Sequence, residues 1–154
     1  MGDVREVRSG RFADLDGRTV YDLARLRQEV FVVEQECAYP DLDDADLDAD
    51  TVHFWIDRQD GGAGAAACLR VLRGDGEWKI GRVCATLAER GTGLSAALMR
   101  AALDFLGPEA DVVLGAQTYA AGFYRKFGFA EYGVEYLEDG IPHIMMRHKG
   151  TDPK

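Results

Sequence analysis

The sequence predicts an α/β protein in which a sheet carries helices on both of its faces. Strand and helix patterns alternate along the 154 residues in the order β-α-β-β-β-α-β-α-β-β. Apolar residues with helical spacing mark the first two helices, and three strand patterns stand between them. A chain of this length buries one core, so we expect a single domain over residues 1–150 and a disordered tail over 151–154.

The first helix is expected over residues 19–35, after a short strand at residues 4–7. Thr19 is predicted to be its N-cap, because a hydroxyl there can accept a hydrogen bond from a free amide of the first turn. Apolar residues then recur every three or four positions and give the helix one apolar face. These residues are Leu23, Leu26, Val30 and Val33.

Three strands are expected between this helix and the next one. Residues 52–56 and 65–72 are apolar runs with the length of strands, and residues 78–85 form another after the turn Gly74-Asp75-Gly76. Glycine and aspartate favour tight turns, so these strands are predicted to form a meander.

The second half of the chain alternates helices with strands. An amphipathic helix begins at Leu94, a short buried strand covers residues 112–116, and Gly128 is placed to cap a third helix. Asp139-Gly140 is predicted to be the turn of a final hairpin. The two strands of this hairpin are expected at residues 129–137 and 141–148.

Composition excludes several kinds of partner. The net charge is −9, and the acidic excess lies in residues 1–77, which hold 9 Lys and Arg against 18 Asp and Glu. Such a surface repels a phosphate backbone, so nucleic acid is not expected to bind. No apolar run approaches the ~20 residues of a membrane span, and no export signal opens the chain, so we expect a cytoplasmic protein that does not bind membranes.

The three cysteines are expected to be free thiols. Cys37, Cys68 and Cys84 form no C-x-x-C pair, which argues against a zinc knuckle and a disulfide framework. No metal site is therefore predicted. Cys68 and Cys84 stand in apolar runs and are expected to be small buried side chains rather than nucleophiles.

The segment Arg90-Gly91-Thr92-Gly93-Leu94-Ser95 follows a strand and opens a helix. Its glycines allow several amides to turn toward one point, and the helix N-terminus adds partial positive charge, so the segment can hold a pyrophosphate. Taken alone, it is equally compatible with a plain strand-to-helix turn. It does not match a P-loop, which needs Lys-Ser/Thr after the glycines, or a dinucleotide fingerprint, which needs three glycines in an early βαβ unit.

This loop resembles motif A of the GNAT N-acetyltransferase superfamily, Q/R-x-x-G-x-G/A. Arg90, Gly93 and Ser95 stand at the matching positions, with serine in place of the usual Gly or Ala. The resemblance implies a central mixed, mostly antiparallel sheet with a splayed middle. It also implies acetyl-CoA as co-substrate, with residues 90–95 on its pyrophosphate.

The resemblance extends along the chain in the order that the family shows. Residues 81–85 look like the splayed strand, with Val83 and Ala85 as contacts of the pantetheine arm. Tyr124 takes the position of the family's tyrosine, and Gln117 lies seven residues earlier, where many relatives have an Asn that touches the cofactor. Residues 31–35, 37–41 and 136–144 resemble the ElaA-like branch of the superfamily.

Acetyl transfer to an amine needs an acid and a base. A departing thiolate has a reference pKa near ~8.5, and Tyr124 can protonate it, although an aromatic core residue is the alternative for this position. An amine with a pKa of ~10.4 must lose a proton before it attacks. Glu34 and His143 are the candidate bases, with Glu138 as a weaker one, and each of them is also compatible with a purely structural role.

Residues 41–50 form an acidic segment, and no Lys or Arg occurs between Arg27 and Arg58. The segment is expected to attract a cationic amine or a basic peptide, although a merely solvated loop has the same composition. A calcium loop is excluded, because Ala49 and Trp55 stand where an EF-hand needs Gly and Glu. Its aspartates are Asp41, Asp43, Asp44, Asp46, Asp48 and Asp50.

The sequence therefore predicts an N-acetyltransferase that brings acetyl-CoA and a primary amine together for direct attack, without a covalent intermediate on the protein. Two alternatives stay open. One is a non-catalytic acyl-CoA-binding or sensor domain, and the other is an acyltransferase that uses a longer acyl chain. The sequence is compatible with a monomer or a homodimer.

Overall fold

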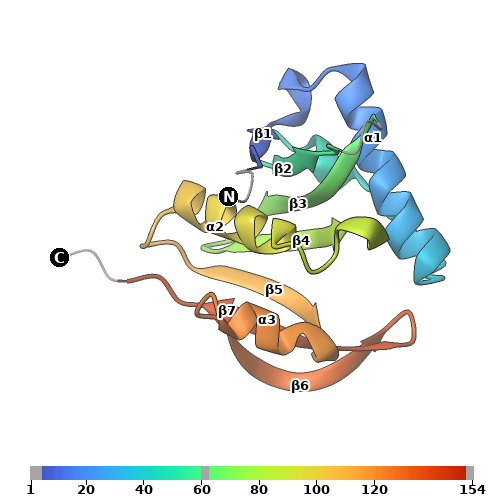
Figure 1. The fold of residues 1–154 in the computed structure, drawn as a ribbon. Coiled ribbons are helices and arrows are strands. Elements are labelled where there is room, and N and C mark those ends of the chain that lie inside the picture. The colour runs from blue at the N-terminus through green and yellow to red at the C-terminus, as the bar shows by residue number, and fades with distance from the viewer. Residues whose placement is uncertain (1–4, 60–62, 152–154) are drawn as a thin grey trace.

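The computed structural model describes residues 5–59 and 63–151, and a seven-stranded sheet runs through this part of the chain (Figure 1). Its strands are β1 (Arg8–Gly10), β2 (Val52–Asp57), β3 (Ala65–Arg73), β4 (Trp78–Ala85), β5 (Val112–Gln117), β6 (Ala130–Glu138) and β7 (Ile141–His148). Their spatial order is β1-β2-β3-β4-β5-β7-β6, and all neighbours are antiparallel except β4 and β5, which are parallel. The mixed, mostly antiparallel sheet is confirmed.

Helices cover both faces of the sheet, as predicted (Figure 1). They are α1 (Gly17–Arg27), α2 (Leu94–Leu106) and α3 (Ala121–Arg125), and short 3-10 turns cover Phe12–Asp14, Asp44–Leu47, Leu87–Glu89 and Thr118–Ala120. Because side chains alternate along a strand, β2 buries Trp55 on the face of α1, and Phe54 and Ile56 on the face of α2 and α3. The core therefore lies on both sides of the central strands.

The first helix begins at Gly17, and its N-cap is Asp16. The Asp16 carboxylate accepts a 2.8 Å hydrogen bond from the Thr19 backbone amide, so Thr19 lies inside the first turn. The prediction of Thr19 as the cap was wrong. Both residue types make good caps, and the chain enters the helix from Asp16, whose backbone is extended with ψ 166°.

The predicted helix over 19–35 is α-helical only as far as Arg27. From Gln28 to Glu34 the chain continues as a wider π-helix, in which the Gln35 amide donates to the Val30 carbonyl at 3.0 Å. The apolar spacing alone did not separate these two helical forms. The π-helical segment ends beside a cavity between β4 and β5.

The other predicted elements match the structure closely. The strands expected at 52–56, 65–72, 78–85 and 112–116 are β2 to β5. Asp139 and Gly140 both have left-handed backbones, with φ 51° and 78°, as the predicted hairpin turn requires. Among the described residues, no helix combines the length and the apolarity that crossing a bilayer needs.

The two ends of the chain differ from the expected pattern. The opening strand is β1 and begins after the predicted range of 4–7, of which Val4 lies outside the described residues. At the other end, the Gly150 amide donates to Asp111 at 2.8 Å, and the Thr151 amide donates to the Pro108 carbonyl at 2.9 Å. Residues 152–154 of the predicted tail lie outside the described part.

Candidate active site

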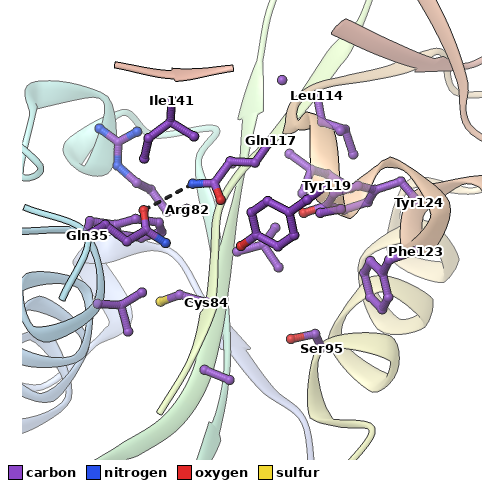
Figure 2. Close-up of a pocket in the computed structure, with 18 of the residues that line it drawn as sticks. Gln35, Arg82, Cys84, Ser95, Leu114, Gln117, Tyr119, Phe123, Tyr124 and Ile141 are labelled. Carbon is purple, nitrogen blue, oxygen red and sulfur yellow. Dashed lines mark hydrogen bonds between the residues drawn. The ribbon is translucent and has the colours of Figure 1, made fainter. Parts of the chain in front are cut away.

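A cavity of about 690 Å³ opens where β4 and β5 move apart. The two strands pair only at Trp78–Val112 and Lys79–Val113, so β5 leaves the following residues of β4 without a partner on that side. The splayed middle of the sheet is thereby confirmed. The π-helical segment lies on one side of the cavity, and α2 and α3 lie on the other (Figure 2).

The cavity brings together nearly all of the residues predicted for the site. Those that line it are Glu34, Val83, Ala85, Arg90, Gly91, Gly93, Leu94, Ser95, Gln117, Tyr124 and His143. Thr92 is not among the lining residues, and its hydroxyl donates to the Glu89 carbonyl at 2.5 Å, which braces the loop. Side chains far apart in the sequence, such as Glu34 and His143, thus share one cavity.

The loop before α2 has the geometry of an anion cradle. Gly91 and Gly93 have φ 81° and 88°, values that other residues rarely adopt, and a Cβ on either would meet no atom of residues 5–59 and 63–151 within 4 Å. Within the described part of the chain no side chain caps α2, and Ala97 donates to the Gly93 carbonyl at 3.0 Å as the first bond of the helix. The amides of residues 94–96 therefore remain available at the cavity wall for a phosphate.

Arg90 is held by an acid and by a backbone carbonyl. Its two Nη atoms donate to the two carboxylate oxygens of Glu34 at 2.5 and 2.6 Å. Its Nε and Nη2 donate to the Ala85 carbonyl at 3.2 and 3.1 Å. The hydrogen bonds from Arg90 hold the pKa of Glu34 below its usual value, so Glu34 is a weak base while Arg90 binds it.

β4 contains a bulge beside the cavity at Arg82. The register with β3 shifts between Cys68 and Arg70, and Arg82 has φ 54°. Such a backbone costs a non-glycine residue ~1–3 kcal/mol, so surrounding contacts must hold it in place. Asp41 supplies them, because Arg82 Nε lies 2.9 Å from its carboxylate and Nη2 donates to its carbonyl at 3.2 Å.

Tyr124 projects into the cavity from α3, close to Tyr119 (Figure 2). Its ring packs edge-on against Phe123 and Phe129, with centroid distances of 5.1 and 6.4 Å. Burial raises the pKa of the Tyr124 phenol to about 12, so the hydroxyl is protonated at neutral pH. Its position is compatible both with core packing and with proton donation.

His143 lies on β7, opposite Gln117 of β5. Its Nδ1 is 2.7 Å from the Ile141 carbonyl, which can only accept, so this nitrogen carries a proton. In the neutral ring Nε2 is then unprotonated, and it lies 3.4 Å from a carboxylate oxygen of Glu138. An imidazolium formed by proton uptake at Nε2 would be paired with that carboxylate.

The predicted site residues did not include Gln35, Tyr119 or Arg82, all of which line the cavity. Gln117 Nε2 donates to Gln35 Oε1 at 3.1 Å, so an amide pair joins β5 to the end of the π-helical segment (Figure 2). The available signal for Gln35 was its place in residues 31–35, which carried the resemblance to the ElaA-like branch. Its partner is 82 positions away and leaves no local pattern.

The acidic segment of residues 41–50 is not an open patch of negative charge. Asp43 and Asp46 accept hydrogen bonds from Arg70 at 2.6 and 2.8 Å, and Asp46 accepts another from Arg27 at 2.8 Å. Asp41 is 6% exposed and accepts from Arg27 at 2.9 Å. Three of the six aspartates thus neutralise arginines, so the segment offers a cationic partner much less charge than the sequence suggested.

The three cysteines are free, and Cys68 and Cys84 are buried, as predicted; Cys37 is buried as well. Cys68 and Cys84 face each other across β3 and β4, with their Sγ atoms 3.7 Å apart. The contact with Cys68 and burial raise the pKa of the Cys84 thiol, which disfavours the reactive thiolate. A nucleophilic role for Cys84, which lines the cavity, is therefore disfavoured.

Comparisons with known sequences agree with this geometry. A family model described as an acetyltransferase (GNAT) domain matches residues 23–149. A UPF0039 protein of Mycobacterium tuberculosis is 44% identical over 90% of this chain and 89% of its own length. Protein ElaA of Escherichia coli is 39% identical over 87% of this chain and 90% of its own length.

Solved structures share the fold over almost the whole chain. An acyl-CoA N-acyltransferase from Pseudomonas aeruginosa has a TM-score of 0.86 and 40% identity, and the match covers 94% of this chain and 99% of that one. Escherichia coli ElaA has a TM-score of 0.86 and 36% identity, with 95% and 100% covered. The chain therefore belongs to the GNAT acetyltransferase family and is similar to its ElaA and UPF0039 proteins, within a fold of acyl-CoA-dependent acyltransferases.

Proposed function

We propose that this protein is an N-acetyltransferase, in which acetyl-CoA and a primary amine bind together and the amine attacks the thioester directly. The observation that carries the proposal is the cavity between β4 and β5. An uncapped helix N-terminus and a protonated phenol both belong to its wall. Acyl transfer from a phosphate-bearing thioester needs an anion site and a donor for the leaving sulfur in one place.

The residues of the cavity fit coenzyme A. The loop over residues 90–93 and the amides of residues 94–96 would hold the pyrophosphate, with the dipole of α2 favouring its negative charge. The backbone around Val83 and Ala85, which β5 leaves unpaired, would pair with the amides of the pantetheine arm. Bound in this way, acetyl-CoA supplies the thioester carbonyl that the amine attacks.

Tyr124 is proposed as the donor to the leaving sulfur. A phenol with a pKa of about 12 is a weaker acid than a thiol near ~8.5, so complete proton transfer from it is unfavourable. Its contribution is therefore a hydrogen bond that strengthens as negative charge develops on the sulfur. The proton released by the amine, or one from solvent, then completes the protonation of the thiolate.

His143 is proposed as the base that deprotonates the amine. Its Nδ1 hydrogen bond to the Ile141 carbonyl leaves Nε2 as the acceptor in the neutral ring. Glu138 would stabilise the imidazolium that results. Glu34, the other candidate, is engaged by Arg90, and this pairing argues against it as a base while the pair is intact.

A panel of amines and basic peptides, tested with acetyl-CoA for release of free thiol, checks the proposal. We expect thiol release that depends on at least one amine, with the acetylated amine identified by mass spectrometry. Coenzyme A binding without turnover of any amine would favour the non-catalytic acyl-CoA-binding domain. Faster turnover with longer acyl-CoA thioesters would favour the other alternative, an acyltransferase of different chain-length preference.

A further inference from the structure

We infer that the Glu34 carboxylate and the phosphates of coenzyme A compete for the same guanidinium, that of Arg90. The inference rests on the coenzyme site proposed above and adds a role for the Glu34–Arg90 pair. Coenzyme binding would turn Arg90 away from Glu34 and leave a free carboxylate on the cavity wall. Glu34 would thus lower the affinity of the protein for the coenzyme.

The geometry of the pair supports direct competition. Arg90 uses both Nη atoms on Glu34, at 2.5 and 2.6 Å, and this is the two-pronged face with which arginine also binds phosphate. The side chains of Arg90 and Glu34 are 38% and 40% exposed, so water can replace either partner. Pairs exposed to this degree exchange at a modest free-energy cost.

A second contact of Arg90 lies on the proposed path of the coenzyme. Its Nε and Nη2 donate to the Ala85 carbonyl, at the end of β4 and beyond the part that β5 covers. A pantetheine arm that pairs with this backbone would claim the same carbonyl. The coenzyme would therefore act on Arg90 in two ways. Its pantetheine arm would displace the guanidinium from the Ala85 carbonyl, and its phosphates would offer the guanidinium new acceptors. Both effects favour movement of Arg90 away from Glu34.

Release of Glu34 has a consequence for the second substrate. The freed carboxylate, no longer stabilised by Arg90, faces a cavity that must accept a cationic amine. It would attract the ammonium group before deprotonation, so that coenzyme and amine bind with positive coupling. The expected order of binding is coenzyme first and amine second.

Calorimetric titration with coenzyme A tests the competition. Glu34→Gln removes the competing charge and keeps the size of the side chain, so affinity should rise about two- to fivefold, the range expected for a half-exposed ion pair. The same substitution in an Arg90→Gln background should change affinity much less, because no guanidinium is left to compete for. Titrations up to millimolar coenzyme cover the weaker binding expected of this background.

Glu29→Gln is the matched control. Glu29 pairs with Arg25 at 3.0 Å, is 51% exposed, and stands in the same π-helical segment, yet it does not line the cavity. This variant loses the same charge and should bind coenzyme A like the parent. Urea unfolding of all variants verifies that each is folded.

The outcomes separate the inference from the proposed function. Unchanged or weaker coenzyme binding by Glu34→Gln would overturn the competition and leave the coenzyme site standing. An equal gain in the Arg90→Gln background would also overturn it, because the effect would then be long-range removal of charge. A parent protein that does not bind coenzyme A would reject the proposed function, and the inference with it.

Discussion

Arg27 of α1 donates from Nη1 to the Asp46 carboxylate at 2.8 Å, and this bond ties the first helix to the acidic segment. Arg70 of β3 donates to the same oxygen at 2.8 Å. The two arginine side chains are only 5% and 6% exposed, so their charges depend on partners such as Asp46. The same segment supplies Asp41 to the bulge at Arg82, so buried charge pairs hold one wall of the cavity.

Asp46→Asn is expected to destabilise the fold. The variant keeps the shape of the side chain but removes the charge that two buried arginines share, at a cost of about 1.5–3 kcal/mol. Urea unfolding at pH 7 measures the loss. Asp44→Asn, at an exposed position of the same segment, is the control and should stay within about 0.5 kcal/mol of the parent. Equal stabilities of the two variants would contradict the structural role of Asp46.

The stability of the parent should fall as the pH drops below the ordinary range of aspartate, near ~3.9. Hydrogen bonds from Arg70 lower the pKa of Asp43, and although burial acts in the opposite direction, Arg27 and Arg70 lower that of Asp46 as well. A group with a lowered folded-state pKa stabilises the fold above its unfolded-state pKa, and this contribution disappears as the pH falls through the folded-state value.

The difference in unfolding free energy between the parent and Asp46→Asn measures this effect. The other carboxylates contribute to both proteins, so their contribution cancels in the difference. We expect the difference to be largest near neutral pH and to shrink steadily in acid. A difference that stays constant from pH 7 to pH 3 would mean that Asp46 contributes its shape rather than its charge.

The sequence predicted the elements of this fold better than its charge pairs. Local patterns placed β2 to β5 and the last hairpin, because strand periodicity and turn residues act over a few positions. The pairing of Asp46 with Arg70 depends on a strand that lies 24 residues further along the chain. Composition could only show that the segment is acidic, and its partners came from the tertiary structure.

The candidate site was predicted residue by residue but not as a network. The glycine loop and Tyr124 carry a family pattern, so their shared cavity could be expected from the resemblance. The bond between Glu34 and Arg90 joins two residues 56 positions apart that were assigned separate roles. Likewise, the left-handed backbone of Arg82 follows from a bulge that no strand pattern reveals.

Ser95→Trp should abolish coenzyme A binding. Ser95 lies in the first turn of α2 and lines the cavity, and an indole there would fill the space where residues 94–96 present their amides. This position is preferable to Gly93, where φ 88° would add backbone strain to any substitution. Arg100→Trp, on the exposed side of the same helix, is the control and should retain affinity in calorimetry. Binding of the coenzyme by folded Ser95→Trp would remove α2 from the site.

His143→Gln should lower kcat by roughly 10²–10⁴-fold at neutral pH, as loss of a general base does. The defect should shrink as the pH rises toward the amine pKa of ~10.4, because the amine then loses its proton without help. The ratio of parent to variant kcat across pH 7–10 is the measurement. Glu138→Gln should cost less, since Glu138 only stabilises the imidazolium. A pH-independent defect in His143→Gln would return His143 to a structural role.

Tyr124→Phe separates the two functions that the position of Tyr124 allows. The ring that packs against Phe123 and Phe129 is kept, and only the hydroxyl is lost. If the phenol stabilises charge on the departing sulfur, kcat should fall by roughly 10²–10³-fold while affinity for coenzyme A stays near that of the parent.

Because burial raises the pKa of this phenol to about 12, it stays protonated up to alkaline pH. The defect of Tyr124→Phe should therefore be nearly constant from pH 7 to pH 10, unlike that of His143→Gln. Tyr119→Phe is the necessary comparison, since Tyr119 presents a second hydroxyl to the same cavity (Figure 2). A large loss in Tyr119→Phe with full activity in Tyr124→Phe would transfer the donor role to Tyr119 and leave Tyr124 as a packing residue.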